Sequence, residues 1–167
     1  MYAKKQIGIS LVEVIVMLAI ISILSAVALP PMIELLQQRR ADATISALRA
    51  DVTLARTAAI MSGHPVTICP RAQIGHCTTQ LDWSRGWLVV TGDLKAPADI
   101  LRIGALPADG DVSLVSNRKA LRYRTDGTSA GSNQTMRVCV RGQQRGTLII
   151  SNGGRPRSER TIPPIPC

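Results

Sequence analysis

The hydrophobic and polar positions divide the first part of the chain into two helical zones. Residues 9–30 form an apolar run interrupted by a single charge, Glu13, and the run is long enough to span a bilayer as a helix. In residues 31–62 the apolar positions recur at spacings of three and four, which predicts an amphipathic helix. These positions are Ile45, Leu48, Val52, Ala55 and Ala59. Gly63, followed by a His-Pro pair, predicts the end of this helix.

Residues 63–167 have the pattern of short strands separated by turns. The runs are rich in β-branched residues and are bounded by Gly, Asp, Asn and Pro. Six runs stand out: VTICP, GWLVV, DVSLV, ALRYR, MRVCV and GTLIIS. Since no second long helical pattern follows, we predict an α+β fold in which one long N-terminal helix packs on a small antiparallel sheet. Trp83 and Trp87 are interpreted as core residues beneath that sheet rather than as a platform for a ligand.

Positive charge is concentrated in the last third of the sequence. The chain has a formal net charge of +9, and residues 118–167 carry ten Lys and Arg against two acidic residues. Residues 1–117 are nearly balanced, with ten basic and nine acidic residues. Such an excess favours a polyanionic partner, either nucleic acid or acidic lipid. The imbalance also predicts that the basic cluster lacks acidic partners within the chain.

The sequence carries no pattern typical of an enzyme. It has no Gly-rich phosphate loop, no nucleophile elbow and no pair of acids at catalytic spacing. The segment GGRPR is too short to be a phosphate-loop motif. We therefore expect no catalytic residue, no cofactor and no metal.

Two interpretations of the N-terminal segment compete. Residues 25–28, SAVA, would suit cleavage of an ordinary secretory signal. The apolar run is longer than the core of such a signal, however, and Glu13 is costly in lipid unless it has a partner. These two features favour a segment that is retained.

The segment KKQIGISLVEVIVMLAIISILSAVALP resembles the class III signal of type IV pilins and type II secretion pseudopilins. In that resemblance, residues 1–8 are a prepilin leader, and a prepilin peptidase cleaves after Gly8 on the cytoplasmic face. Ile9, where the family more often has Phe, becomes the methylated N-terminus, and Glu13 is the fifth mature residue. The resemblance implies that residues 9–30 anchor the subunit in the inner membrane and later enter the filament core.

The resemblance also gives Glu13 a partner, because in the filament it would meet the N-terminus of a neighbouring subunit. Pro30 and Pro31 fall where pilin helices often bend or melt, in keeping with the amide hydrogen that proline lacks.

The rest of the chain resembles the GspH/FimT branch of minor pilins. The segments that carry this resemblance are DWSRGWLVV, LRYRTDGTSAG, MRVCVRG and GTLIISNGGRPR. It implies a single-pass inner-membrane protein with a β-rich periplasmic head at 63–167, which then joins a pilus filament or reaches the cell surface. The implied partners are other pilin subunits.

The four cysteines suit an exported pilin, because pairs of cysteines form disulfides in an oxidising periplasm. Of the three pairings that four cysteines allow, we favour Cys69 with Cys77 and Cys139 with Cys167. The alternative is a zinc site with four candidate ligands: His64, Cys69, His76 and Cys77. The adjacent His-Cys pair fits structural zinc spacings poorly, and the histidines are interpreted as loop residues.

The segment GRPR resembles the GRxR motif of FimT-type pilins, which are associated with DNA uptake in naturally transformable bacteria. The resemblance and the charge excess together identify candidate DNA-binding residues, in order of preference: Arg155, Arg157, Arg160, Arg145 and Arg141. Gly153 and Gly154 would let the chain turn sharply after a strand. Arginine suits this role because its planar guanidinium grips phosphate at two points.

The expected mode of DNA binding is sequence-independent contact with phosphates, preferably of a duplex. Tyr123 is the one aromatic residue in the basic third, whereas single-strand binders interleave aromatic and basic residues. Binding of this kind is weak for each subunit and strongly dependent on salt. The alternative is a structural minor pilin, or a GspH-like pseudopilin that primes filament assembly, with its arginines facing protein.

Overall fold

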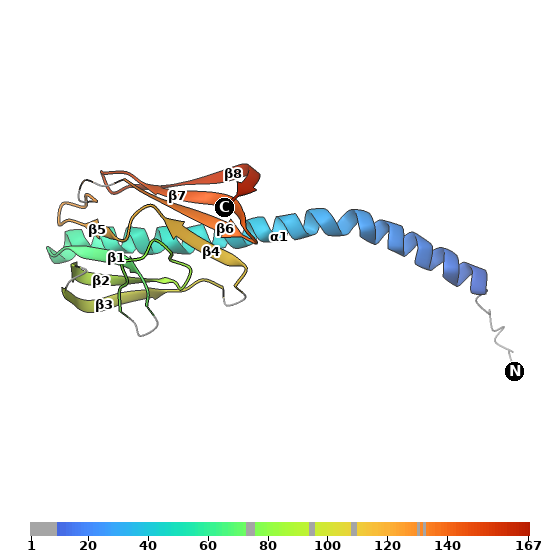
Figure 1. Cartoon of the computed structure of the whole chain (residues 1–167), viewed down its shortest axis with the longest axis horizontal. Helices are drawn as coiled ribbons and strands as arrows, with labels where there is room; N and C mark the ends of the chain where they lie inside the picture. Colours follow the sequence, from blue (N-terminus) through green and yellow to red (C-terminus); the bar gives the residue numbers. More distant parts are fainter. Residues whose placement is uncertain (1–9, 73–75, 94–95, 108–109, 130, 132) are drawn as a thin grey trace, which may run out of the picture. The chain divides into compact units, whose positions relative to one another are not determined.

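A computed structural model describes most of the chain (Figure 1). The described residues are 10–72, 76–93, 96–107, 110–129, 131 and 133–167. The predicted leader, its cleavage point at Gly8 and the methylated Ile9 lie outside them. The chain forms two compact units, residues 1–36 and residues 37–167.

One helix, α1, runs from Leu11 to Ser62 and continues through Pro30 and Pro31. It ends at the predicted residue, and Gly63 follows in the left-handed conformation with φ 66°. Residues 11–36 are all exposed, including Glu13 in the first turn. By length and composition this part is apolar enough to cross a membrane.

Eight antiparallel strands follow the helix and form two four-stranded sheets. Their bounds are β1 Val66–Pro70, β2 Trp87–Asp93, β3 Ala96–Gly104, β4 Val112–Ser116, β5 Leu121–Tyr123, β6 Gln134–Val140, β7 Gln143–Ile150 and β8 Pro156–Pro166. The first sheet has the order β3-β2-β1-β5, and the second has the order β4-β6-β7-β8. In Figure 1, β1 to β3 and β6 to β8 lie to either side of the C-terminal part of α1. The α+β prediction is confirmed, whereas β3 and β8 were missed.

The hydrophobic core lies between the inner faces of the sheets and the predicted stripe of α1. All five residues of that stripe are buried. Trp83 and Trp87 are fully buried, which confirms that they are core residues. The indole Nε1 of Trp87 donates a hydrogen bond of 2.8 Å to Asp51 on α1, and Arg102 of β3 forms an ion pair with the same carboxylate at 3.2 Å. The main core cluster falls entirely within residues 41–150, so the unit 37–167 contains its own core.

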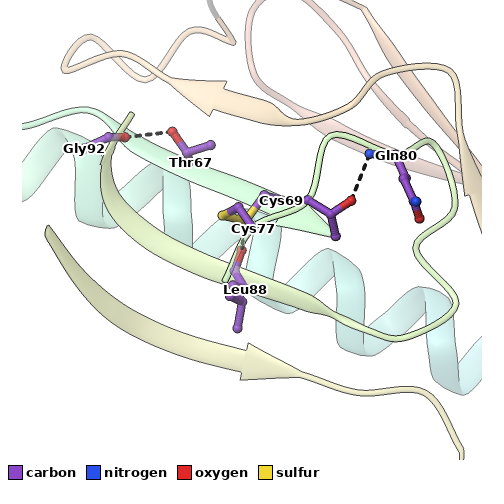
Figure 2. The surroundings of a disulfide bond; sticks show 7 residues. Thr67, Cys69, Cys77, Gln80, Leu88 and Gly92 are labelled. Atoms are coloured by element: carbon purple, nitrogen blue, oxygen red, sulfur yellow. Dashed lines mark hydrogen bonds between the residues drawn. A yellow bond between two sulfur atoms is a disulfide. The ribbon is translucent and has the colours of Figure 1, made fainter. Parts of the chain in front are cut away.

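Both predicted disulfides are present. Cys69 pairs with Cys77, and Cys139 of β6 pairs with Cys167 at the end of β8. Figure 2 shows the first bridge, which links β1 to the loop that follows it, with Leu88 of β2 beside the pair. Because Cys69 and Cys77 are bonded to each other, neither offers the thiolate that a zinc site would require.

Candidate nucleic-acid interface

A tight hairpin joins β7 to β8 and positions the predicted GRPR motif. The amide of Ser151 donates to the carbonyl of Arg155 at 3.3 Å, and the amide of Gly154 donates to the carbonyl of Ser151 at 2.8 Å. This pattern is that of a three-residue loop whose last residue is left-handed. Gly154 has φ 75° and Gly153 does not have a positive φ, so Gly154 is the residue that makes the turn. Ser151 and Arg155 therefore close the hairpin, and the first arginine of the motif follows the turn directly.

The hairpin is held in place by hydrogen bonds from the end of β5 and from the segment that follows it. Tyr123 donates its hydroxyl hydrogen to the carbonyl of Gly154 at 2.9 Å. The hydroxyl of Ser129 donates to the carbonyl of Ser151 at 2.8 Å, and the side chain of Asn133 accepts from the amide of Asn152 at 3.0 Å. Three side chains thus fix the backbone from which Arg155 projects.

The Tyr123 hydroxyl predicts a pH effect on stability. Burial raises the pKa of Tyr123 well above its ordinary value of about 10, and the nearby Arg56 opposes this rise only in part. A phenol whose pKa is raised on folding contributes stability that is complete below about pH 10 and is lost as the pH rises further. We expect near-ultraviolet absorbance of the unit 37–167, in which Tyr123 is the sole tyrosine, to show ionisation only together with unfolding.

A Tyr123→Phe variant is the control. It should lose this alkaline dependence and, because it leaves the buried carbonyl of Gly154 without its donor, lose about 1–3 kcal/mol of stability at neutral pH. Ionisation near pH 10 in a chain that stays folded would contradict this account.

Arg155 and Arg157 project from the outer face of the second sheet, the face turned away from α1. On the neighbouring strand β7, Leu148 and Ile150 are buried in the core while Thr147 and Ile149 alternate outward. Arg157 pairs with Ile149 in the register and shares its face. Its side chain is 72% exposed.

The two arginines border a hollow of about 470 Å³. The hollow is lined by Asn133, Thr135, Ile149, Ser151, Arg155, Pro156 and Arg157.

Arg137 of β6 lies on the same outer face and was not among the candidate residues. Across the sheet it pairs with Thr147, and Thr147 pairs with Glu159. Its side chain is exposed between the buried Met136 and Val138. Arg137 could have been identified from the alternation within MRVCV. Neighbouring residues of a strand point to opposite faces, so Arg137 points away from the face that carries Met136 and Val138. Among the described residues, Arg137 and Arg155 have no acidic partner within ion-pair distance.

Arg160 faces the opposite side of β8. It pairs with Gly146, whose missing side chain would meet Ile45 of the helix. Its guanidinium forms two contacts with Asp42 of α1, Nη2 to Oδ2 at 2.8 Å and Nε to Oδ1 at 3.3 Å. The structure therefore separates Arg160 from Arg155 and Arg157 and gives it a contact with the helix.

Arg145 is turned inward by a β-bulge. The register shifts at this residue on both sides of β7, and such an extra residue re-aims a side chain. Arg145 is only 6% exposed and donates from Nη2 to the side chain of Gln37 on α1. We therefore leave Arg145 out of the proposed DNA-binding surface.

Arg141 lies in the turn between β6 and β7, at the other end of the sheet. The eight residues of β7 put it roughly 25 Å from the hairpin that carries Arg155. Asp111 pairs with it at 3.1 Å and also pairs with Arg40 of α1 at 2.8 Å.

The expectation that the basic cluster lacks acidic partners is therefore wrong for three residues: Arg141, Arg157 and Arg160. Two of the partners, Asp42 and Asp111, come from the first 117 residues, and a local charge count could not assign them.

The outer face thus presents three arginines with the chemistry of a phosphate-binding surface. Each guanidinium is planar, permanently charged and able to donate two parallel hydrogen bonds to one phosphate. No group of three metal-ligating side chains occurs in the part of the chain that the structure describes. The face is an open, charged strand surface and not an enclosed pocket.

Two solved structures share the fold of this chain. Two crystal structures of the type IV minor pilin FimU from Pseudomonas aeruginosa PAO1 match with TM-scores of 0.60 and 0.62 at 18% sequence identity. Each match covers 74% of this chain, with 96% and 91% of the FimU chains covered. The fold is thus that of a type IV minor pilin. No curated protein matches the sequence.

A family profile described as "Type II transport protein GspH" matches residues 44–154, and the chain belongs to this family. The match ends directly before Arg155. The family and the fold together point to a structural subunit rather than an enzyme, one that interacts with other pilin subunits. The apolar helix is consistent with a single-pass membrane anchor.

Proposed function

We propose that this chain is a FimT-like minor type IV pilin that binds extracellular DNA and promotes its uptake in natural transformation. The observation that carries the proposal is the outer face of the second sheet, which presents Arg155 and Arg157 two residues apart and Arg137 two strands away on β6. Arg155 and Arg137 have no acidic partner among the described residues, so their charge is available to a polyanion. Arg160, Arg141 and Arg145 are not part of this surface.

The mode of binding follows from the chemistry of the surface. Phosphate contacts position a protein on DNA without reading its sequence. The surface has no helix that could enter a groove and no exposed aromatic residue for base stacking. Contact with the phosphates of a duplex, independent of sequence, is therefore the mode we propose. Several subunits along a filament would raise the avidity.

The rest of the proposed life cycle rests on the N-terminal residues. Prepilin peptidase would cleave after Gly8, and Ile9 would carry the methylated amine. Residues 9–30 would hold the subunit in the inner membrane with its head in the periplasm. In the filament, Glu13 would meet the N-terminus of a neighbouring subunit, which would supply the partner that an acid in an apolar segment requires.

The test of DNA binding is a titration of the full chain in a nonionic detergent with a short duplex at two salt concentrations. Three phosphate contacts predict a slope of about −2.7 in a plot of log affinity against log salt. Between 50 and 200 mM salt, affinity should then fall roughly 40-fold. A protein that ignores DNA at both concentrations would contradict the proposal.

A second candidate function is a structural minor pilin, or a GspH-like pseudopilin, that primes filament assembly without binding DNA. The observation that favours it is the family match, which includes residues 44–154 and none of the arginines of the motif. Deletion of the gene separates the two functions, because loss of an assembly subunit should abolish pili. Loss of a DNA receptor should reduce transformation while pili remain.

A further inference from the structure

Glu159 is the one acidic residue in the four strands of the second sheet, and it lies beside the proposed DNA-binding arginines. It stands two residues after Arg157 on β8 and shares the outer face. The Nη2 atom of Arg157 lies 2.9 Å from Oε1 of Glu159. While the Nη2 group of Arg157 is paired with Glu159, it is not free to donate a hydrogen bond to a phosphate.

We propose that Glu159 is an intramolecular competitor that occupies Arg157 and is displaced when a DNA phosphate binds. This inference rests on the proposed function of the surface. Glu159 always lies close to Arg157, because both residues belong to β8. The pair is nevertheless easy to open, since the two side chains are 72% and 49% exposed and an ion pair in that setting is weak.

The surroundings of the pair explain why DNA displaces the carboxylate. Arg155 precedes Arg157 by two residues, and Arg137 lies two strands away in the row of Glu159. A phosphodiester chain held by these two arginines presents its next phosphate to Arg157 at a high local concentration. The free energy needed to open the Arg157–Glu159 pair lowers the affinity of each subunit for DNA. Glu159 therefore keeps DNA binding weak and reversible.

The expected effect of Glu159→Gln is a gain in affinity. Glutamine keeps the size of the side chain and removes its charge, which frees Arg157. The coupling measured for exposed ion pairs corresponds to a gain of roughly two- to five-fold in duplex affinity. The gain should shrink as salt is raised, because salt weakens the competing pair.

A double-mutant cycle on the full chain in nonionic detergent tests the inference, with a short duplex as the probe. Four proteins are titrated: the natural chain, Glu159→Gln, Arg157→Gln and the double variant. We expect the gain from Glu159→Gln to disappear in the Arg157→Gln background, because no guanidinium is left to free. Asp111→Asn is the matched control. It makes the same change in net charge at the other end of the sheet, where Arg141 is paired, and should leave affinity nearly unchanged.

Each other outcome overturns the inference. A gain that persists without Arg157, or an equal gain from Asp111→Asn, would mean that only net charge matters. A natural chain that binds the duplex while Glu159→Gln gains nothing would mean that Glu159 does not compete. If neither the natural chain nor any variant binds DNA, the proposed function itself fails.

Discussion

Replacing Gly154 by alanine is expected to lower the stability of the unit 37–167 by about 2–4 kcal/mol. The residue has φ 75°, which costs an L side chain about 1–2 kcal/mol. A Cβ atom there would lie 2.3 Å from the carbonyl oxygen of Gly127 and 2.7 Å from Cε1 of Tyr123. The backbone cannot yield easily, because Arg56 of α1 donates to that same carbonyl at 3.0 Å. Urea unfolding of the purified unit measures the effect.

Gly153 is the matched control for this prediction. It is the neighbouring loop residue, it has no positive φ, and the nearest atom to a Cβ there is Ser151 Oγ at 3.9 Å. Gly153→Ala should therefore change stability by no more than about 0.5 kcal/mol. Equal losses at the two glycines would refute the assignment of the turn to Gly154.

Removing the Cys139–Cys167 disulfide is expected to cost about 3.5 kcal/mol. The bridge closes a segment of 28 residues, and the chain-entropy relation for a loop of that size gives this value. A variant with alanine at both positions should unfold at lower urea concentration. Its duplex affinity at moderate temperature should be retained, because the hairpin that carries Arg155 lies at the other end of β7 and is held by its own hydrogen bonds.

The effect of removing the Cys69–Cys77 bridge is compared with that of removing the Cys139–Cys167 bridge. The Cys69–Cys77 bridge closes only eight residues, so its removal should cost about 2.5 kcal/mol. A larger loss from this pair than from Cys139 and Cys167 would contradict the ranking by loop size. Loss of DNA binding in a still-folded Cys139/Cys167 variant would mean that the bridge positions the arginines.

The helix and the core were predictable because their signals are local. The spacing of Leu48 and Val52 identifies the buried side of α1 whatever packs on it. The tryptophans are large enough that burial is their strongest preference. The two disulfides followed from the resemblance to exported pilins and from the choice of one pairing among three.

Strands β3 and β8 could not be predicted from alternation. β3 is interrupted by Pro97 and by register shifts against β2, so its apolar positions do not repeat every second residue. β8 contains four prolines, a composition typical of a loop rather than a strand. It is an edge strand paired only with β7, and an edge tolerates residues that cannot donate to a second neighbour.

The candidate site was predicted in part. Arg155 and Arg157 do share one surface, because they lie two residues apart where the chain enters β8. Arg160 is five residues after Arg155 and so falls on the opposite face, where an acid from 118 residues earlier meets it. Arg145 is buried because of a bulge, and no pattern in the sequence marks a bulge at that position. Ion pairs between residues far apart in the sequence depend on the tertiary structure, so a count of charges along the chain cannot predict them.

The most direct test of the central claim is duplex affinity in two double variants that remove the same charge. Arg155→Gln with Arg157→Gln removes the outer surface, while Arg141→Gln with Arg160→Gln removes two arginines that are paired with Asp111 and Asp42. Both are measured in the full chain at low salt, after unfolding curves show that each variant is folded.

We predict that the first double variant loses about tenfold or more in affinity, because each lost contact is a hydrogen bond between charged groups. Its salt slope should fall by about 1.8. The second variant should keep its affinity within about threefold. Equal losses in the two variants, or no loss in the first, would contradict the account and leave assembly of the filament as the function of the chain.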